Sequence, residues 1–177
     1  MKREAKPNPL DSCKSLQDVK SLVDLGCSPN VRDFRGATPL YWNRSITAIR
    51  AMIAAGADAN VRDRIGATPL HTQKKAEIVR AIIKEGADVN AVDKDGYTAL
   101  HLAWHPAAVF ELLCAGADPN VRNSKGESVE ANYGGGKLAV AMAKMVREVR
   151  TKGRLLRKRW EDYLPESESK RHTSHRR

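Results

Sequence analysis

A short motif recurs every 30 residues along this chain and restricts its fold more than any other feature. The sequence Gly-Ala-Asp-Ala-Asn at 56–60 is followed by Gly-Ala-Thr-Pro-Leu-His at 66–71. The polar positions of the motif keep the same spacing, as Asn30, Asn60, Asn90 and Asn120 and as Asp33, Asp63, Asp93 and Asn123. A fixed period of this size indicates a solenoid, in which each unit buries its apolar face against its neighbours.

Each period predicts a short helix, a longer helix and a projecting loop. Thr68 followed by Pro69 is typical of a helix start, because proline at the first helical position lacks a donor that would stay unpaired anyway. Residues 78, 79, 82 and 83 are Ile or Val, which is the spacing of a buried helical stripe. Gly86 is expected to end that helix, and the polar run over 88–96 is typical of turns.

These motifs resemble the ankyrin repeat, with its Gly-x-Thr-Pro-Leu-His start and Gly-Ala-Asp-x-Asn exit. The resemblance covers roughly residues 8–133, and Tyr41 stands where the other units have His. It implies an all-α ankyrin-repeat solenoid. The family's usual period is about 33 residues, so the shorter period here predicts a first helix cut by about a turn. Repeats trimmed in this way resemble those of bacterial ankyrin-repeat proteins.

The chain is expected to divide into three parts. Residues 1–136 form the repeat domain, with units starting near 8, 38, 68 and 98 and a degraded fifth unit near 128. Residues 137–164 form a basic amphipathic helix that Gly153 interrupts, and its first half is expected to cap the fourth unit. Residues 165–177 are rich in serine and charge and are predicted to be disordered.

The positive charge is concentrated at the C-terminal end. The net charge is +10, and residues 137–177 hold 13 Lys and Arg against 5 Asp and Glu. The polar first residues are unlike a signal peptide, and no run approaches the roughly 20 apolar residues of a membrane span. Three cysteines without metal spacing fit a reducing compartment. The cytoplasm is therefore the predicted location, with the nucleus or secretion into a host cell as alternatives.

Signatures of catalysis are missing from the sequence, so no enzyme activity, cofactor or metal is predicted. The pair His71 and His101 lies one period apart, and the resemblance implies that such histidines form hydrogen bonds between units. The pair His101 and His105 has a spacing that suits zinc on a helix. Pro106 follows at once, and no third ligand is evident.

The resemblance implies a protein-binding surface at the loop tips and the adjacent concave face. Phe34 and Ile65 are predicted anchors, because apolar side chains flanked by arginines are typical of interfaces, although single exposed apolar residues are also common on any surface. Tyr41, Trp42 and Trp104 either extend this surface or pack between units. The partner is expected to present acidic residues around an apolar pocket to a monomeric chain. The predicted partner-binding residues are Arg32, Phe34, Arg35, Arg62, Arg64, Ile65, Lys94, Asp95, Tyr97, Arg122 and Lys125.

A second hypothesis assigns binding to the basic helix and treats the repeats as a scaffold. Its cations would contact nucleic acid or an anionic membrane, and phosphate contacts would make binding strongly dependent on salt. A solvated cap with no binding role explains the same residues equally well. A third hypothesis is a secreted bacterial effector that acts on a host protein. The residues of the second hypothesis are Lys144, Arg147, Arg150, Arg154, Arg157, Lys158 and Arg159.

Overall fold

The computed structural model describes residues 16–134, 137–155 and 159–164. Within these ranges the chain forms helices and turns, and its β-type pairing is limited to two isolated bridges. The predicted all-α class is therefore confirmed. In chain order the elements are α1 (Leu16–Asp24), α2 (Pro39–Trp42), α3 (Ile46–Ala54), α4 (Pro69–Thr72), α5 (Ala76–Lys84), α6 (Ala99–Leu102), α7 (Pro106–Cys114), η2 (Val129–Asn132), α8 (Lys137–Lys152) and η3 (Trp160–Tyr163).

Each complete unit pairs a very short helix with a longer one. The first helix has 4 residues in α2, α4 and α6, and the second has 9 residues in α3, α5 and α7. Proline begins both α2 and α4, as its fixed φ favours. Gly86 follows the end of α5 with a φ of 81°, a conformation that costs glycine little. The short first helix agrees with the prediction from the 30-residue period.

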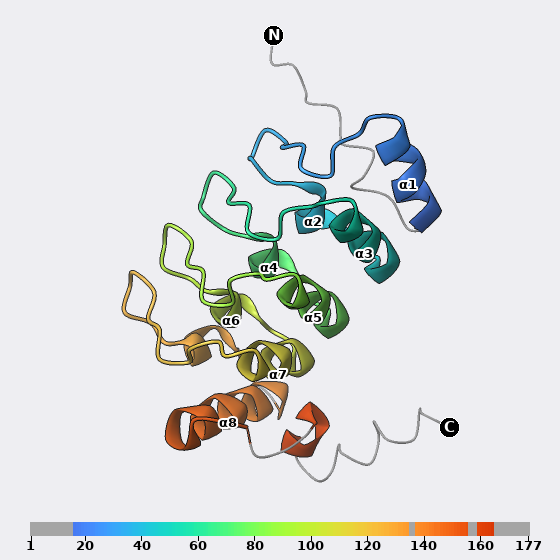
Figure 1. The fold of residues 1–177 in the computed structure, drawn as a ribbon. Helices are drawn as coiled ribbons and strands as arrows, with labels where there is room; N and C mark the ends of the chain where they lie inside the picture. The colour runs from blue at the N-terminus through green and yellow to red at the C-terminus, as the bar shows by residue number, and fades with distance from the viewer. Residues whose placement is uncertain (1–15, 135–136, 156–158, 165–177) are drawn as a thin grey trace, which may run out of the picture.

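The units stack into an elongated array (Figure 1). The longer helices α1, α3, α5 and α7 form one row, the short helices form a second row, and the loops project on the side away from the longer helices. Ile49 and Met52 of α3, Ile78 and Ile82 of α5, and Leu112 of α7 are buried between neighbouring units. Burial is thus shared between adjacent units, so each unit depends on the next for its core.

The C-terminal helix α8 continues the row of longer helices. It has 16 residues and packs against α7, while η2 takes the place of a first helix. Met142, Met145 and Val146 are buried in the same core as the repeats. The residues on the two sides of position 136 therefore share one hydrophobic core.

The helix predicted over residues 137–164 is wrong in its extent. The helix ends at Lys152, and Gly153 has a φ of 69°, which a right-handed helix cannot continue. A 3-10 turn, η3, follows at Trp160–Tyr163, and Tyr163 is buried. The predicted tail (165–177) and the predicted start of the first unit near residue 8 lie outside the described residues. None of the described helices is long and apolar enough to cross a membrane.

Candidate functional site

The projecting loops are built on a turn that repeats in each unit. In the loop 58–67, the Asp63 carboxylate accepts hydrogen bonds from the backbone N–H groups of Ile65 (3.0 Å) and Ala67 (2.9 Å). A side-chain acceptor of this kind fixes the turn without help from other loops. The Asp33, Asp93 and Asn123 side chains accept the equivalent bonds in their own loops. Each loop therefore holds its tip residues in a defined position.

Neighbouring loops are joined by a ladder of hydrogen bonds. The Asn60 amide donates to the carbonyl of Gly86 (2.9 Å) and accepts from the N–H of Asp88 (2.8 Å), and Asn30 and Asn90 make the same pair of bonds. At the tips, the N–H of Arg64 donates to the carbonyl of Arg35 (2.8 Å). The equivalent tip bonds join Lys94 to Ile65 and Ser124 to Asp95. The loop tips consequently form one surface in a fixed register.

The arginines beside the turn brace this ladder. The Arg62 guanidinium donates to the carbonyls of Gly66 (2.9 Å) and Val92 (2.6 Å), and Arg32 makes the equivalent bonds to Gly36 and Arg62. Arg122 donates within its own loop, to Gly126. The sequence predicted these arginines as partner contacts; the structure shows in addition that their guanidiniums bond to loop carbonyls, and the partner contact stays a prediction. Their recurrence at the 30-residue spacing is the signal that could have indicated these bonds.

Two apolar side chains and two arginines occupy the first tips. Phe34 and Ile65 are each 60% exposed. The Arg35 guanidinium lies 5.2 Å from the Phe34 ring centroid and 5.9 Å from that of Trp42, within the range of cation–π attraction. Arg35 and Arg64 form no ion pair with any residue that the structure describes. The predicted anchors and their flanking charges are therefore exposed together.

A groove of about 430 Å³ lies between these tips and the short helices. Phe34 and Ile65 line it from the loops, and Trp42 of α2 and Leu102 of α6 line it from the helices. Trp42 is 36% exposed and Leu102 is 41% exposed. The sequence analysis did not identify Leu102, although it lies two periods after Trp42. The remaining lining residues are Arg35, Asp63, Arg64, Ala67, His71, Thr72 and Asp93.

The base of the groove is internally bonded. The His71 ring forms a hydrogen bond to the carbonyl of Tyr97 (3.0 Å), as the predicted role between units requires. Burial lowers the pKa of His71, so the ring is neutral at pH 7. Thr72 donates to the carbonyl of Tyr41 (2.9 Å). These groups are already paired, so recognition would depend on the tips and the apolar walls.

The three aromatic residues left open by the sequence have different environments. Tyr41 is fully buried, and its hydroxyl lies 2.7 Å from the carbonyls of both Val61 and Ala67 in the next loop. It therefore takes the role that His71 has one unit later. Trp42 lines the groove, and Trp104 is 57% exposed with the Lys74 ammonium 5.1 Å from its ring centroid.

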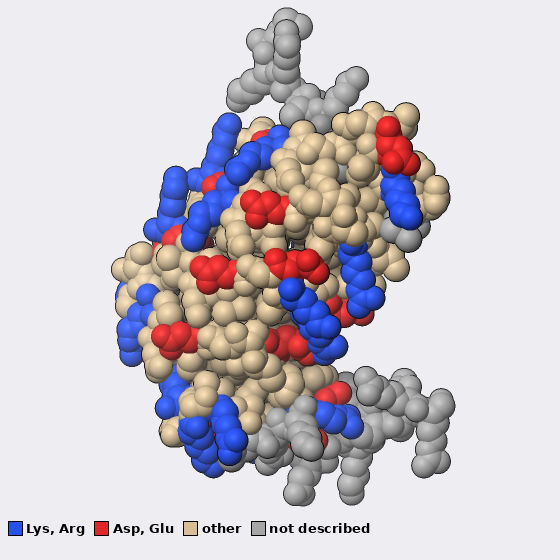
Figure 2. Space-filling model, in the orientation of Figure 1, with Lys and Arg blue, Asp and Glu red and all other residues tan. Residues whose placement is uncertain are grey.

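The predicted binding residues of the later loops lie at or near their loop tips but do not line the groove. Lys94, Asp95 and Lys125 are exposed at their tips. Tyr97 is half-buried, and its hydroxyl donates to the Glu127 carboxylate (3.3 Å). The structure thus brings together the apolar tip residues of the first two loops, while the tips of the later loops carry Lys94, Asp95 and Lys125. Figure 2 shows Lys and Arg along the projecting loops, near α8 and over the longer helices, with Asp and Glu interspersed among them.

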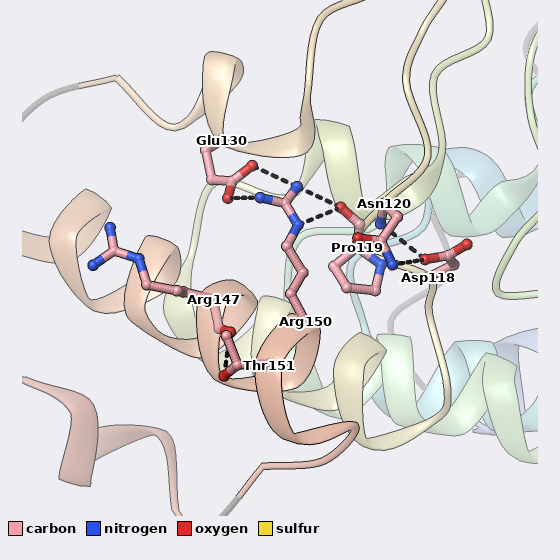
Figure 3. Close-up of polar contacts among 7 residues, drawn as sticks. All are labelled: Asp118, Pro119, Asn120, Glu130, Arg147, Arg150 and Thr151. Carbon is pink, nitrogen blue, oxygen red and sulfur yellow. Dashed lines mark hydrogen bonds and ion pairs between the residues drawn. The ribbon is translucent and has the colours of Figure 1, made fainter.

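The basic residues of α8 do not form one exposed face. The Arg150 guanidinium donates to the Pro119 carbonyl (2.6 Å) and forms an ion pair with the Glu130 carboxylate (Figure 3). Lys144 and Arg147 are exposed on the same helix. Arg150 thus remains exposed but is bonded to the fifth unit, unlike the free-standing cation that the second hypothesis requires.

The remaining cations of the second hypothesis follow the end of α8. Arg154 is exposed, and Arg159 is paired with Glu161 at 3.5 Å. Arg157 and Lys158 lie outside the described residues. The described part of the chain therefore offers a dispersed set of cations at this end.

The histidines considered as metal ligands have other partners. His105 begins α7, where its ring accepts a hydrogen bond from the N–H of Ala107 (3.2 Å). Burial lowers the pKa of His101, as it does for His71. Over the described ranges, no three His, Cys, Asp or Glu side chains form a group that could hold a metal ion.

The comparisons with known proteins agree with the geometry of the units. Residues 42–123 match the family model described as ankyrin repeats (3 copies). No curated protein matches the chain.

Proposed function

Residues 42–123 are ankyrin repeats, which makes the chain an ankyrin-repeat protein; from this premise we propose that it binds a partner protein, without catalysis, through the groove and the first loop tips. Ankyrin repeats are generally protein–protein interaction modules. The observation that carries the proposal is the exposure of Phe34 and Ile65 on rigid loops, beside arginines that have no ion pair among the described residues. An apolar surface with a charged rim is the usual composition of an interface.

The ladder between the loops favours tight binding. Because hydrogen bonds fix the tips before a partner arrives, little conformational entropy is lost on association. Phe34 and Ile65 would supply most of the affinity, as a few central apolar side chains do in most interfaces. Arg35 and Arg64 would mainly raise the association rate with an acidic partner, and this effect would weaken as the salt concentration rises.

The experiment compares two double variants in partner capture from a nuclease-treated lysate. Phe34→Ala with Ile65→Ala removes the anchors, and Leu25→Ala with Val140→Ala removes apolar side chains that are 80% and 62% exposed elsewhere. We expect the first variant to lose the retained protein and the second to keep it. Both should unfold at the temperature of the wild type, because none of the four side chains is buried.

Retention of the same protein by both variants would contradict the proposal. A protein retained from untreated lysate but lost after nuclease treatment would instead support nucleic-acid binding through the cations near α8. Replacing Lys144, Arg147 and Arg154 with Gln would then test that alternative, since all three are exposed and described.

A further inference from the structure

We propose that the groove receives one aromatic or large aliphatic side chain of the partner while Arg35 and Arg64 bind a carboxylate next to it. The ligand is then a short peptide segment with an apolar residue flanked by Asp or Glu. This inference rests on the proposed function and reverses the geometry expected from the sequence, in which Phe34 and Ile65 enter a pocket of the partner. In the structure these two side chains line a concave site of about 430 Å³.

The walls of the groove suit a single apolar side chain. Four apolar residues surround it, two from successive loops (Phe34 and Ile65) and two from the short helices (Trp42 and Leu102). Ligand sites commonly have volumes of about 300–1,000 Å³, so this groove lies near the lower end. The bond from the N–H of Arg64 to the carbonyl of Arg35 (2.8 Å) fixes the separation of the two loops. The site is therefore formed before a ligand binds.

The rim of the groove supplies two arginines that form no ion pair with any residue that the structure describes. The Arg35 guanidinium lies over the Phe34 and Trp42 rings, which hold it at the mouth of the groove. Arg64 lines the same mouth from the next loop. Arginine binds carboxylates through two parallel hydrogen bonds. A carboxylate adjacent to the inserted side chain would thus meet two cations.

The acidic residues of the groove favour a peptide over nucleic acid. Asp63 and Asp93 also line it, and each fixes its turn through one carboxylate oxygen. A strand with one phosphate per nucleotide would bring repeated negative charge against these carboxylates. A peptide can place one or two carboxylates at the arginines and avoid the aspartates.

The experiment uses three fluorescein-labelled peptides in a Gly-Ser background. The first contains Asp-Phe-Asp, the second replaces Phe with Ala, and the third replaces both Asp with Lys. Anisotropy titration of the full chain should show binding of the first peptide and at least about tenfold weaker binding of the other two, a difference of about 1.4 kcal/mol. Amide resonances of residues 34, 42, 65 and 102 should shift with the first peptide.

Charge reversal tests the role of the arginines. Arg35→Glu with Arg64→Glu should invert the preference, so that the Lys peptide binds better than the Asp peptide. Arg50→Glu with Lys84→Glu changes the net charge equally on the other face and should leave the preference unchanged; both residues are exposed.

Three results would overturn the inference. The first is an unchanged peptide preference in Arg35→Glu with Arg64→Glu. The second is no binding of the Asp-Phe-Asp peptide at about 1 mM, a dissociation constant that corresponds to about −4.1 kcal/mol. The third is a single-stranded oligonucleotide that shifts the same resonances more strongly than the peptide. The lysate experiment separates these failures from failure of the proposed function. If Phe34→Ala with Ile65→Ala still loses the captured protein, the face binds a partner of different chemistry. If that variant keeps the protein, the proposed function fails as well.

Discussion

The loop 58–67 and the loop 118–127 have the same turn but different connections. In both loops the side chain at the turn, Asp63 in one and Asn123 in the other, accepts two backbone hydrogen bonds. Asn60 then bonds to the next unit, at Gly86 and Asp88. Asn120 bonds instead to Asp118 in its own loop.

The difference shows that the turn is a local property and the ladder is a property of neighbours. No further loop follows the loop 118–127 in the described structure, so Asn120 and Arg122 bond within their own loop. Arg150 of α8 supplies the missing connection by donating to the Pro119 carbonyl and pairing with Glu130 (Figure 3). The last loop is therefore held by the preceding loop on one side and by α8 on the other.

The largest expected effect tests whether α8 shares the hydrophobic core of the repeats. Ile82→Ala in α5 and Met145→Ala in α8 should each lower the free energy of unfolding by about 2–5 kcal/mol, because both side chains are fully buried. Val140→Ala in α8 is the matched control, since that side chain is 62% exposed. Urea denaturation monitored by circular dichroism measures all three. A Met145→Ala variant as stable as the control would show that α8 is an appendage.

Two glycines test whether a neighbouring loop matters at the tips. Gly96 and Gly126 have φ values of 78° and 76°, so an alanine at either position costs about 1–2 kcal/mol in backbone strain. At Gly96 the added Cβ would lie 2.9 Å from the N of Ser124 in the next loop, while at Gly126 it would meet no atom within 4 Å. We therefore expect Gly96→Ala to be the more destabilising substitution in the same denaturation assay. Equal losses would mean that the loops do not restrain each other.

The next prediction compares Arg150 of α8, which is paired with Glu130, with Arg147 of the same helix. Arg150→Met should lower the free energy of unfolding by about 1–3 kcal/mol, because it removes charged hydrogen bonds to Pro119 and leaves Glu130 without its partner. Arg147→Met, on the exposed side of the helix, should change it by less than about 0.5 kcal/mol. Thermal melts of both variants measure the difference in stability. Equal midpoints would show that Arg150 does not stabilise the last unit.

The smallest expected effect compares two asparagines of the repeat. Asn60→Ala should cost about 1–2 kcal/mol, since it removes two hydrogen bonds between units. For Asn120→Ala we expect less than about 0.5 kcal/mol, because its side-chain bond stays within one exposed loop. Hydrogen exchange locates the change: the N–H of Asp88, which donates to Asn60, should exchange faster in Asn60→Ala, while the N–H of Asp118, which donates to Asn90, should be unchanged in both variants. Faster exchange in both variants to the same degree would argue against the distinction.

Part of the candidate site could be predicted from the sequence. Phe34 and Ile65 stood out as apolar residues at loop tips, and both line the groove. Leu102 did not stand out, because a leucine on a short helix is ordinarily expected in the core. Arg32 and Arg62 were predicted to contact a partner, yet they bond to carbonyls of their own and the next loop. Their exposed location was predicted, and their hydrogen-bond partners were not.

The sequence by itself determined the repeating unit of this protein. The structure contains the 30-residue period, Pro69 at a helix start, Gly86 after a helix end and Asp63 at a turn. The last three of these features depend on contacts between residues close in the chain. These contacts are local, so the pattern alone specifies them.

The tertiary structure decided how distant residues combine. It placed Phe34, Trp42, Ile65 and Leu102 around one groove, and it paired Arg150 with Glu130 of the fifth unit. The separation and relative orientation of stacked units set these arrangements. No single unit encodes that geometry, because it arises only when neighbouring units pack together.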